Sequence, residues 1–373
     1  MRFRPSLASA LAASLLVSTL AAEPVIDTIA FGSCARERRE QPIWDEIIKT
    51  DPDLFLFIGD NQYADFWEKD GKMVMQRVPG IERIDEAYAA LAAKPGFQRM
   101  KAHCPMLATW DDHDYGDNDS GKDFPFRAQS QKAFLDFFGF ASDDPIRRQE
   151  GIYHARTFGP ADKRVQVILL DTRYHRDLLE KGTPGAAAPG TSPRGARGGG
   201  PYVPTTNTSK TVLGETQWRW LEARLHEPAH VRIIVSSIQV VADEHGHETW
   251  GNFPHERQRL YDLIASTGAS GVVFISGDRH LAEVSVDRGR GSAHPVPYPM
   301  WDFTSSGMTE PPGKASDPNS FRVGPVSRET NFGVIEIRWG DHPPETTEIS
   351  FTARGDKSQM ITRQSVFLTD LHK

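Results

Sequence analysis

The stretch that most constrains the fold is an apolar run, Leu54–Ile58, that stops abruptly at a glycine and a carboxylate. Five consecutive apolar residues are typical of a short buried strand. After Gly59 the chain presents Asp60 and, three residues later, Tyr63. Open α/β sheets bind ligands at the carboxyl ends of their strands, so an acid and a phenol here predict a site. Both side chains offer oxygen, which hard metal ions prefer.

The same arrangement recurs at three further strand ends. An isolated aspartate in such a position is more often a helix N-cap or a turn residue. Acids gathered in one place would repel one another, at a cost of several kcal/mol, unless cations lay between them. Four such ends together therefore predict a metal site; they are Gly32-Ser33-Cys34, Gly59-Asp60-Asn61-Gln62-Tyr63, Trp110-Asp111-Asp112-His113-Asp114 and Gly277-Asp278-Arg279-His280.

Between these ends, apolar runs alternate with amphipathic segments, which predicts strands and helices in turn. Such alternation predicts a layered α/β sandwich whose loops gather along one side of the sheets. The expected strands are 28–33, 53–58, 106–110, 153–158, 165–170, 232–236, 271–276, 301–305, 333–338 and 348–353. The expected helices are 42–50, 84–93, 127–138, 215–226 and 254–266.

The first 22 residues are predicted to be a signal peptide. Two arginines precede an apolar run and two small residues; these are Arg2, Arg4, Leu7–Leu20 and Ala21-Ala22. A membrane anchor is the alternative, but the run is shorter than the roughly 20 residues of a span. We therefore expect export to the periplasm or the extracellular space. No later apolar run could cross a bilayer, so we expect no integral membrane span.

Charge and composition narrow the class of partner. The net charge is −7 and no basic tract occurs, so no nucleic-acid-binding module is expected. An acidic protein that handled phosphate would need metal ions to neutralise its substrate. Residues 181–210 are rich in Gly, Pro, Ser, Thr and Ala without periodicity, which predicts a flexible loop. A loop of this length is either a mobile insertion or a lid over a site.

The chain has two cysteines, and a disulfide is the ordinary expectation for an exported protein. Cys34 follows one expected strand, whereas Cys104 precedes another. If those strands were parallel neighbours, the cysteines would lie about 17 Å apart, at opposite ends. A disulfide requires Cα atoms within about 7 Å. Cys34 is therefore expected to be a free thiol near Asp60.

The order of these motifs resembles the alkaline phosphatase D (PhoD-like) family of the calcineurin-type metallophosphoesterase superfamily. The resemblance extends from about Asp27 to the C-terminal strands. It implies a layered metallophosphoesterase-type sandwich of two central sheets flanked by helices, over residues 23–373. The matching segments are Phe31-Gly-Ser-Cys34, Gly59-Asp-Asn-Gln-Tyr63, Thr109-Trp-Asp-Asp-His-Asp114, Asp171-Thr-Arg173, Leu213-Gly-Glu-Thr-Gln-Trp218, Ser236-Ser-Ile-Gln239 and Ser276-Gly-Asp-Arg-His280.

The resemblance also implies a set of metal ligands, with Asp60 bridging two ions. The superfamily usually begins with Asp-x-His, whereas this chain has Ser33-Cys34. Asp112 and Asp278 stand where amide or imidazole ligands are usual, which makes the second site oxygen-rich and suits Ca²⁺ better than zinc. The phenolate implies Fe³⁺ at the first site, and a binuclear Zn/Fe centre is the alternative. The implied ligands are Cys34, Asp60, Tyr63, Asp112, Asp278 and His280.

The activity implied by the resemblance is metal-dependent hydrolysis of phosphomonoesters or phosphodiesters, by a metal-bridged hydroxide that attacks phosphorus in line. His113, oriented by Asp114, would hydrogen-bond the phosphoryl oxygen or the leaving group; the alternative is a structural histidine. Arg173 is either a phosphate clamp or an ion-pair partner of Asp171 or Asp177. Further candidates for substrate binding are Gln239 and Asn118.

Two other functions stay open. The chain could be a phospholipase D-like diesterase that acts on a lipid phosphate ester in place of a small molecule. It could also be a secreted binding protein on a degenerate scaffold. A degenerate copy should have lost some ligands, and all of them are present. The run Asp243-Glu-His-Gly-His247 could bind a metal, but we expect an exposed loop there.

Overall fold

The computed structural model describes residues 24–182, 199–289, 295–310, 318–342 and 346–372. The predicted signal peptide lies outside these residues, and so does most of the predicted loop at 181–210. Among the helices of the described residues, none combines the length and the apolar character that crossing a bilayer requires.

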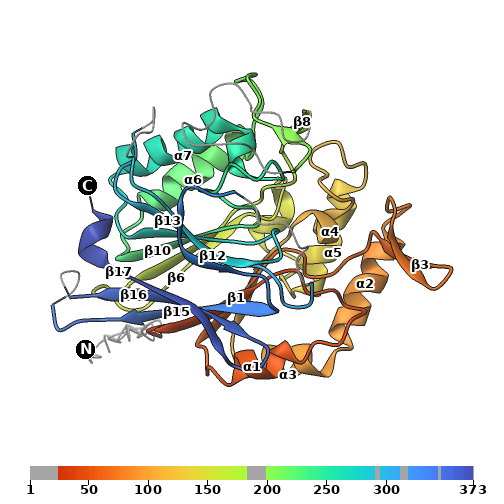
Figure 1. Cartoon of the computed structure of the whole chain (residues 1–373), viewed down its shortest axis with the longest axis horizontal. Coiled ribbons are helices and arrows are strands. Elements are labelled where there is room, and N and C mark those ends of the chain that lie inside the picture. Colours follow the sequence, from red (N-terminus) through yellow and green to blue (C-terminus); the bar gives the residue numbers. More distant parts are fainter. Residues whose placement is uncertain (1–23, 183–198, 290–294, 311–317, 343–345, 373) are drawn as a thin grey trace, which may run out of the picture.

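Two sheets stacked face to face form the body of the protein, as expected (Figure 1). The six-stranded sheet has the order β17-β16-β15-β1-β2-β5, and its strands are Met360–Phe367, Glu348–Gly355, Asn331–Arg338, Thr28–Gly32, Leu54–Ile58 and Met106–Thr109. The seven-stranded sheet has the order β14-β12-β13-β11-β10-β7-β6, and its strands are Arg322–Ser327, Ala282–Asp287, Met300–Ser305, Val272–Ser276, Val231–Ser236, Val165–Leu169 and His154–Phe158.

Helices cover both outer faces of the sandwich, as Figure 1 shows. Helices α6 (Gly214–Leu225) and α7 (Pro254–Thr267) contribute to the core of the seven-stranded sheet. Four helices pack on the far side of the six-stranded sheet: α1 (Ile43–Ile48), α2 (Glu82–Ala92), α3 (Pro95–His103) and α5 (Arg127–Phe137). Smaller elements are α4 (Asp112–Tyr115) and the two-stranded pairs β3–β4 (Phe66–Lys69, Lys72–Met75) and β8–β9 (Glu180–Lys181, Tyr202–Val203).

Strand β2 is buried on both faces, which explains why its sequence contains no polar residue. Successive side chains of a strand point to opposite faces. Leu54, Leu56 and Ile58 join the core between the sheets. Phe55 and Phe57 point the other way and meet the ring of Trp44 in α1, with centroids 5.3 and 5.6 Å apart. Because both faces are buried, every position of the strand is apolar.

The central strands of each sheet run parallel, so their carboxyl ends share one edge. In the six-stranded sheet β2 pairs in parallel with both β1 and β5. In the seven-stranded sheet β10 pairs in parallel with both β7 and β11. The polar segments that follow β1, β2, β5 and β11 are consequently brought together at one edge of the sandwich.

Both cysteines are free, as expected: Cys34 is buried and Cys104 is partly buried. One premise of that expectation was wrong. The two strands beside the cysteines are not neighbours, because β2 lies between β1 and β5.

Candidate metal centre

Sharp, strained backbone marks the ends of these strands. Gly59 has φ 112°, and a Cβ at this position would lie 2.6 Å from the Cβ of Asp111. Only glycine therefore lets the end of β2 approach the end of β5. Among the described residues, eight other than glycine have positive φ, and five of them belong to the clusters defined below: Cys34, Asp60, Asp119, Asp278 and His280. Such strain, on the order of 1–3 kcal/mol per residue, concentrates at functional sites.

The first group of side chains, here called the thiolate cluster, consists of Cys34, Asp60, Tyr63 and His280. The Cys34 thiol and the Tyr63 hydroxyl lie 3.2 and 3.1 Å from Oδ2 of Asp60. The Tyr63 hydroxyl is also 3.3 Å from Nε2 of His280. Ligand atoms of Cys34, Asp60 and His280 lie within 4.8 Å of one another, which is close enough to share one ion. The structure thus brings together these four predicted ligands.

The second group, here called the carboxylate cluster, contains Asp111, Asp112, Asp278, Asp119 and Glu248. Asp112 is common to two sets of three carboxylates whose oxygens lie within 4.8 Å of one another. Asp112 also lies within that distance of Asp60, so the two clusters adjoin. The predicted ligands Asp112 and Asp278 belong here, whereas Asp119 and Glu248 were not predicted.

Unpartnered oxygens show that the carboxylate cluster fits cations. Oδ2 of Asp111, Oδ1 of Asp112 and Oδ2 of Asp278 are buried and have no hydrogen-bond partner. Buried carboxylate oxygens are costly unless a donor or a metal ion meets them. An all-oxygen donor set is the kind that Ca²⁺ and Mg²⁺ prefer. The residues present therefore suit hard metal ions.

Burial controls the protonation of most groups in the two clusters. It raises the pKa of Asp60 and of the Cys34 thiol, and the Asp60 charge raises the latter further. Burial also lowers the pKa of His280 to about 3, helped by the charge of His113, so the imidazole is neutral and can bind a metal. Asp112 differs: burial opposes its ionisation, but His113 and Arg173 hold its pKa well below the usual range.

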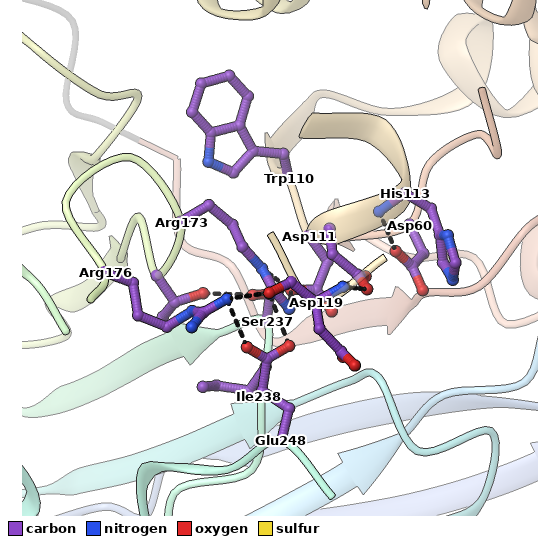
Figure 2. A network of polar contacts seen from close by, with 12 residues as sticks. Asp60, Trp110, Asp111, His113, Asp119, Arg173, Arg176, Ser237, Ile238 and Glu248 are labelled. Atoms are coloured by element: carbon purple, nitrogen blue, oxygen red, sulfur yellow. Dashed lines mark hydrogen bonds and ion pairs between the residues drawn. The ribbon is translucent and has the colours of Figure 1, made fainter. Parts of the chain in front are cut away.

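Two buried arginines balance the carboxylate cluster (Figure 2). Arg173 donates through Nε to Asp111 at 2.7 Å and lies 2.6 Å through Nη1 from Glu248. Arg176 lies 2.9 Å from the other oxygen of Glu248. The expected partners of Arg173 were wrong. Asp171 accepts from its backbone N–H, and Asp177 pairs with Lys122 instead.

Arg173 is therefore not an open phosphate clamp in this structure. Its guanidinium is fully buried, and its strongest contacts are already made to carboxylates. The same contacts raise its pKa against the effect of burial, so the side chain is a permanent positive charge inside the cluster.

His113 points into the site, but its partner is not the predicted one. Nδ1 lies 2.8 Å from Oδ1 of Asp65, and the ring stacks on Tyr63 with centroids 4.2 Å apart. Asp114 instead accepts from the backbone of Asp111 and Asp60, at 2.7 and 3.2 Å. Asp114 is the third residue of α4 and completes its capping box, which turns the carboxylate back toward the helix start. It orients backbone, not the imidazole.

The two predicted substrate contacts have different outcomes. Gln239 is buried, and its amide donates to Glu283 at 2.8 Å and to Thr304 at 2.9 Å, so a substrate-binding role is not supported. Asn118 is exposed and lines a cavity together with Asp65 and Asp119. Its side chain is accessible from that cavity.

Sequence reasoning missed several residues of the site. Asp65 lies in the same loop as Tyr63, only two residues further on, and that proximity was an available signal. Glu248 follows the run 243–247, which was expected to be an exposed loop. The structure contradicts that expectation: Asp243 and His245 are buried, and Asp243 pairs with Arg257 at 2.8 Å. Ser306, which lies 3.1 Å from the Cys34 sulfur, carried no signal.

A two-sheet sandwich with these acids, a thiol and imidazoles at its strand ends defines the metallophosphoesterase class of fold. The chain belongs to the PhoD-like phosphatase family, whose model matches residues 29–332. It is 24% identical over 287 residues to alkaline phosphatase D of Bacillus subtilis (strain 168), a match that covers 69% of this chain and 46% of that protein. The chain thus spans about half the length of this relative.

Solved structures share the fold. A structure of PhoD superposes with a TM-score of 0.65 at 17% identity, over 91% of this chain and 72% of that one. Purple acid phosphatase PPD1 from yellow lupin (Lupinus luteus) seeds gives a TM-score of 0.55 at 11% identity, over 92% of this chain and 54% of that one. The predicted family and fold class are confirmed.

Proposed function

We propose that the protein is a metal-dependent phosphoric ester hydrolase. The observation that carries the proposal is the group of buried, unpartnered oxygens on Asp111, Asp112 and Asp278, which lie beside Asp60 of the thiolate cluster. Family membership supports the same chemistry. A binding protein on a degenerate scaffold is disfavoured, because every predicted ligand is present and lies in one of the two clusters.

The donor sets suggest different metals for the two clusters. Cys34, Tyr63 and His280 would hold Fe³⁺ with Asp60, whereas the carboxylate cluster would hold Ca²⁺; a binuclear Zn/Fe centre is the alternative. When bound, such ions supply Lewis-acid activation of a water and neutralise the phosphoryl oxygens.

The chain itself contributes orientation and proton transfer. Asp65 fixes the Nδ1 side of His113, which leaves Nε2 as the nitrogen that can donate to the departing oxygen of the ester. Asp114 accepts from the backbone N–H groups of Asp60 and Asp111, and so fixes the positions of these two carboxylates relative to each other. Arg173 and Arg176 offset part of the negative charge and keep the acids close together.

Metal analysis of the purified protein, combined with a panel of phosphomonoesters and phosphodiesters, tests the proposal. We expect stoichiometric metal and hydrolysis of at least one ester class. The panel also separates an alkaline phosphatase from a phospholipase D-like diesterase. Metal-replete protein that cleaves no ester would refute the hydrolase.

Colour tests the iron assignment separately. A Tyr63 phenolate on Fe³⁺ should make the protein violet through charge transfer from ligand to metal. Tyr63→Phe should lose the colour while the protein keeps its fold. A colourless, iron-free and fully active enzyme would exclude iron and favour the other metals.

We further propose that the protein acts outside the cytoplasm, because its first 22 residues carry the features of a signal peptide. Cell fractionation with an antibody to the mature chain tests this. Retention of the full-length chain in the cytoplasm would contradict it.

A further inference from the structure

A hollow of about 410 Å³ opens beside the metal centre. It lies between the β3–β4 hairpin, the loop 117–123 and the base of the β8–β9 pair. We call this hollow the side pocket. Binding pockets for small organic molecules begin at about 300 Å³, so the side pocket has room for much more than a phosphate or a methanol.

The side pocket is continuous with the reactive residues. Asp65, whose carboxylate contacts His113, forms part of its wall. Asp119 of the carboxylate cluster forms another part, and the hydroxyl of Tyr202 donates to Asp119 at 2.5 Å. The pocket therefore adjoins the site at Asp65 and Asp119, where it offers space for the part of an ester that departs from phosphorus.

The charges of the side pocket disfavour an anion. Its wall carries four carboxylates, those of Asp65, Asp117, Asp119 and Asp123, against two basic side chains, Arg77 and Lys181. A leaving group that bore its own phosphate or carboxylate would meet net repulsion.

The mouth of the side pocket is apolar. Met75 and Leu178 are among the few large hydrophobic side chains exposed in the described residues, at 49% and 55%, and both line this pocket. They come from separate elements, the end of β4 and the segment before β8. Leu179 and the ring of Tyr202 continue the same surface inward. Apolar surface exposed at a concave site is typical of contact with a ligand.

From these observations we propose that the side pocket binds the alcohol part of the ester, and that this alcohol is uncharged and apolar, of aryl or alkyl type. The inference rests on the proposed hydrolase and names its substrate class. In the reaction, water oxygen bonds to phosphorus and releases a proton to solvent, the bond from phosphorus to the alcohol oxygen breaks, and that oxygen takes a proton from His113, which solvent then protonates again. Met75 and Leu178 set specificity and take no part in this chemistry.

A double variant, Met75→Ser with Leu178→Ser, tests the proposal on esters of 1-naphthol and of glycerol, each as monoester and as methyl diester. We expect kcat/KM to fall about tenfold for the naphthyl esters and less than about twofold for the glycerol esters. Met360→Ser is the matched control, because Met360 is 64% exposed on β17 and does not line the side pocket. It should leave both values unchanged.

An equal loss on both substrates, or no loss on either, would overturn the subsite. Binding of 1-naphthol, followed by its fluorescence, separates this result from failure of the proposed function. If the wild-type protein cleaves no ester, the hydrolase fails. Weaker naphthol binding by the double variant would then still support an apolar pocket, and equal binding would refute it.

A sulfonated 1-naphthyl phosphate tests the charge part of the proposal. Asp123→Asn removes one exposed carboxylate of the wall without a change of shape. Relative to wild type, this variant should raise the ratio of sulfonated to plain naphthyl cleavage about two- to fivefold. An unchanged ratio would show that the wall does not select against anions.

Discussion

The two clusters of the metal centre differ in how far the protein alone supplies hydrogen-bond partners for their polar atoms. Members of the thiolate cluster hydrogen-bond to one another, because the Cys34 thiol and the Tyr63 hydroxyl both donate to Asp60, at 3.2 and 3.1 Å. The carboxylate cluster keeps unpartnered oxygens although two buried arginines stand beside it. The comparison teaches that the first cluster satisfies its polar groups by hydrogen bonds among its own members, whereas the second keeps oxygens that only cations would meet.

The largest effect is expected where the clusters meet. Asp60→Asn removes a charge that both clusters use, so both should lose metal. Activity should fall at least about a hundredfold, beyond the usual cost of losing an outer partner of a metal ligand. Metal content and kcat should be measured together, with Asp341→Asn, an exposed acid, as control. Retention of metal and activity would show that the clusters are independent.

Selective chelation sharpens the contrast further. Excess EGTA should strip the oxygen-rich cluster and reduce hydrolysis to background, while metal bound through Cys34 and His280 stays. Elemental analysis before and after treatment checks this, and added Ca²⁺ should restore the rate. Full activity in excess chelator would count against cations in the carboxylate cluster.

A smaller effect is expected from Asp65→Asn, which leaves every predicted ligand intact. Loss of the charge beside His113 should lower kcat about ten- to hundredfold and leave metal content unchanged. Asp70→Asn, in the exposed turn of the β3–β4 hairpin, is the matched control. A higher KM with a normal kcat would contradict a role in proton transfer.

The smallest effect is expected outside both clusters, in the pH dependence of the stability of the fold. Burial lowers the pKa of His154 below its usual 6.5, and Nδ1 of the ring donates to the carbonyl oxygen of Ile152 at 2.9 Å. Below pH 6.5 His154 binds a proton in the unfolded chain but not in the folded chain. Stability is therefore present above this pH and is lost as pH falls, by at most about 1.4 kcal/mol per pH unit.

His154→Asn should flatten that dependence in urea unfolding followed between pH 5 and 7. His226→Asn, at an exposed position, is the control and should leave the slope as in wild type. An unchanged slope in His154→Asn would assign the acid sensitivity to the metal centre instead.

Periodicity predicted the parts of the molecule that are regular and buried. Strands β1, β2, β5, β10 and β11 are mostly apolar, so their ends, and with them Asp60, Asp112 and Asp278, could be located in the sequence. Strands β12, β14 and β17 were missed, because their sequences mix charged and apolar residues. The pattern of apolar residues along the sequence is a weak signal where a strand lies at a sheet edge or follows a tight turn.

The remaining site residues depend on loop conformation, which has no period to detect. Glu248 reaches the carboxylate cluster because Thr249 binds the carbonyls of Gln239 and Ala242 and folds the loop back on itself. Asp65 displaces Asp114 as the partner of His113 because of the capping box of α4. Such long-range closures follow from packing, so spacing along the chain could not reveal them.

The meeting of strand ends from two different sheets has a consequence for folding. Cys34, Asp60 and Asp112 follow strands of the six-stranded sheet, whereas Asp278 and His280 follow a strand of the seven-stranded sheet. A Cβ at Gly277 would lie 2.7 Å from Oγ of Ser33, so the two sheets nearly touch here. Ions held at this junction would act as a cross-link between distant parts of the chain, and their binding free energy would add to the stability of the whole sandwich.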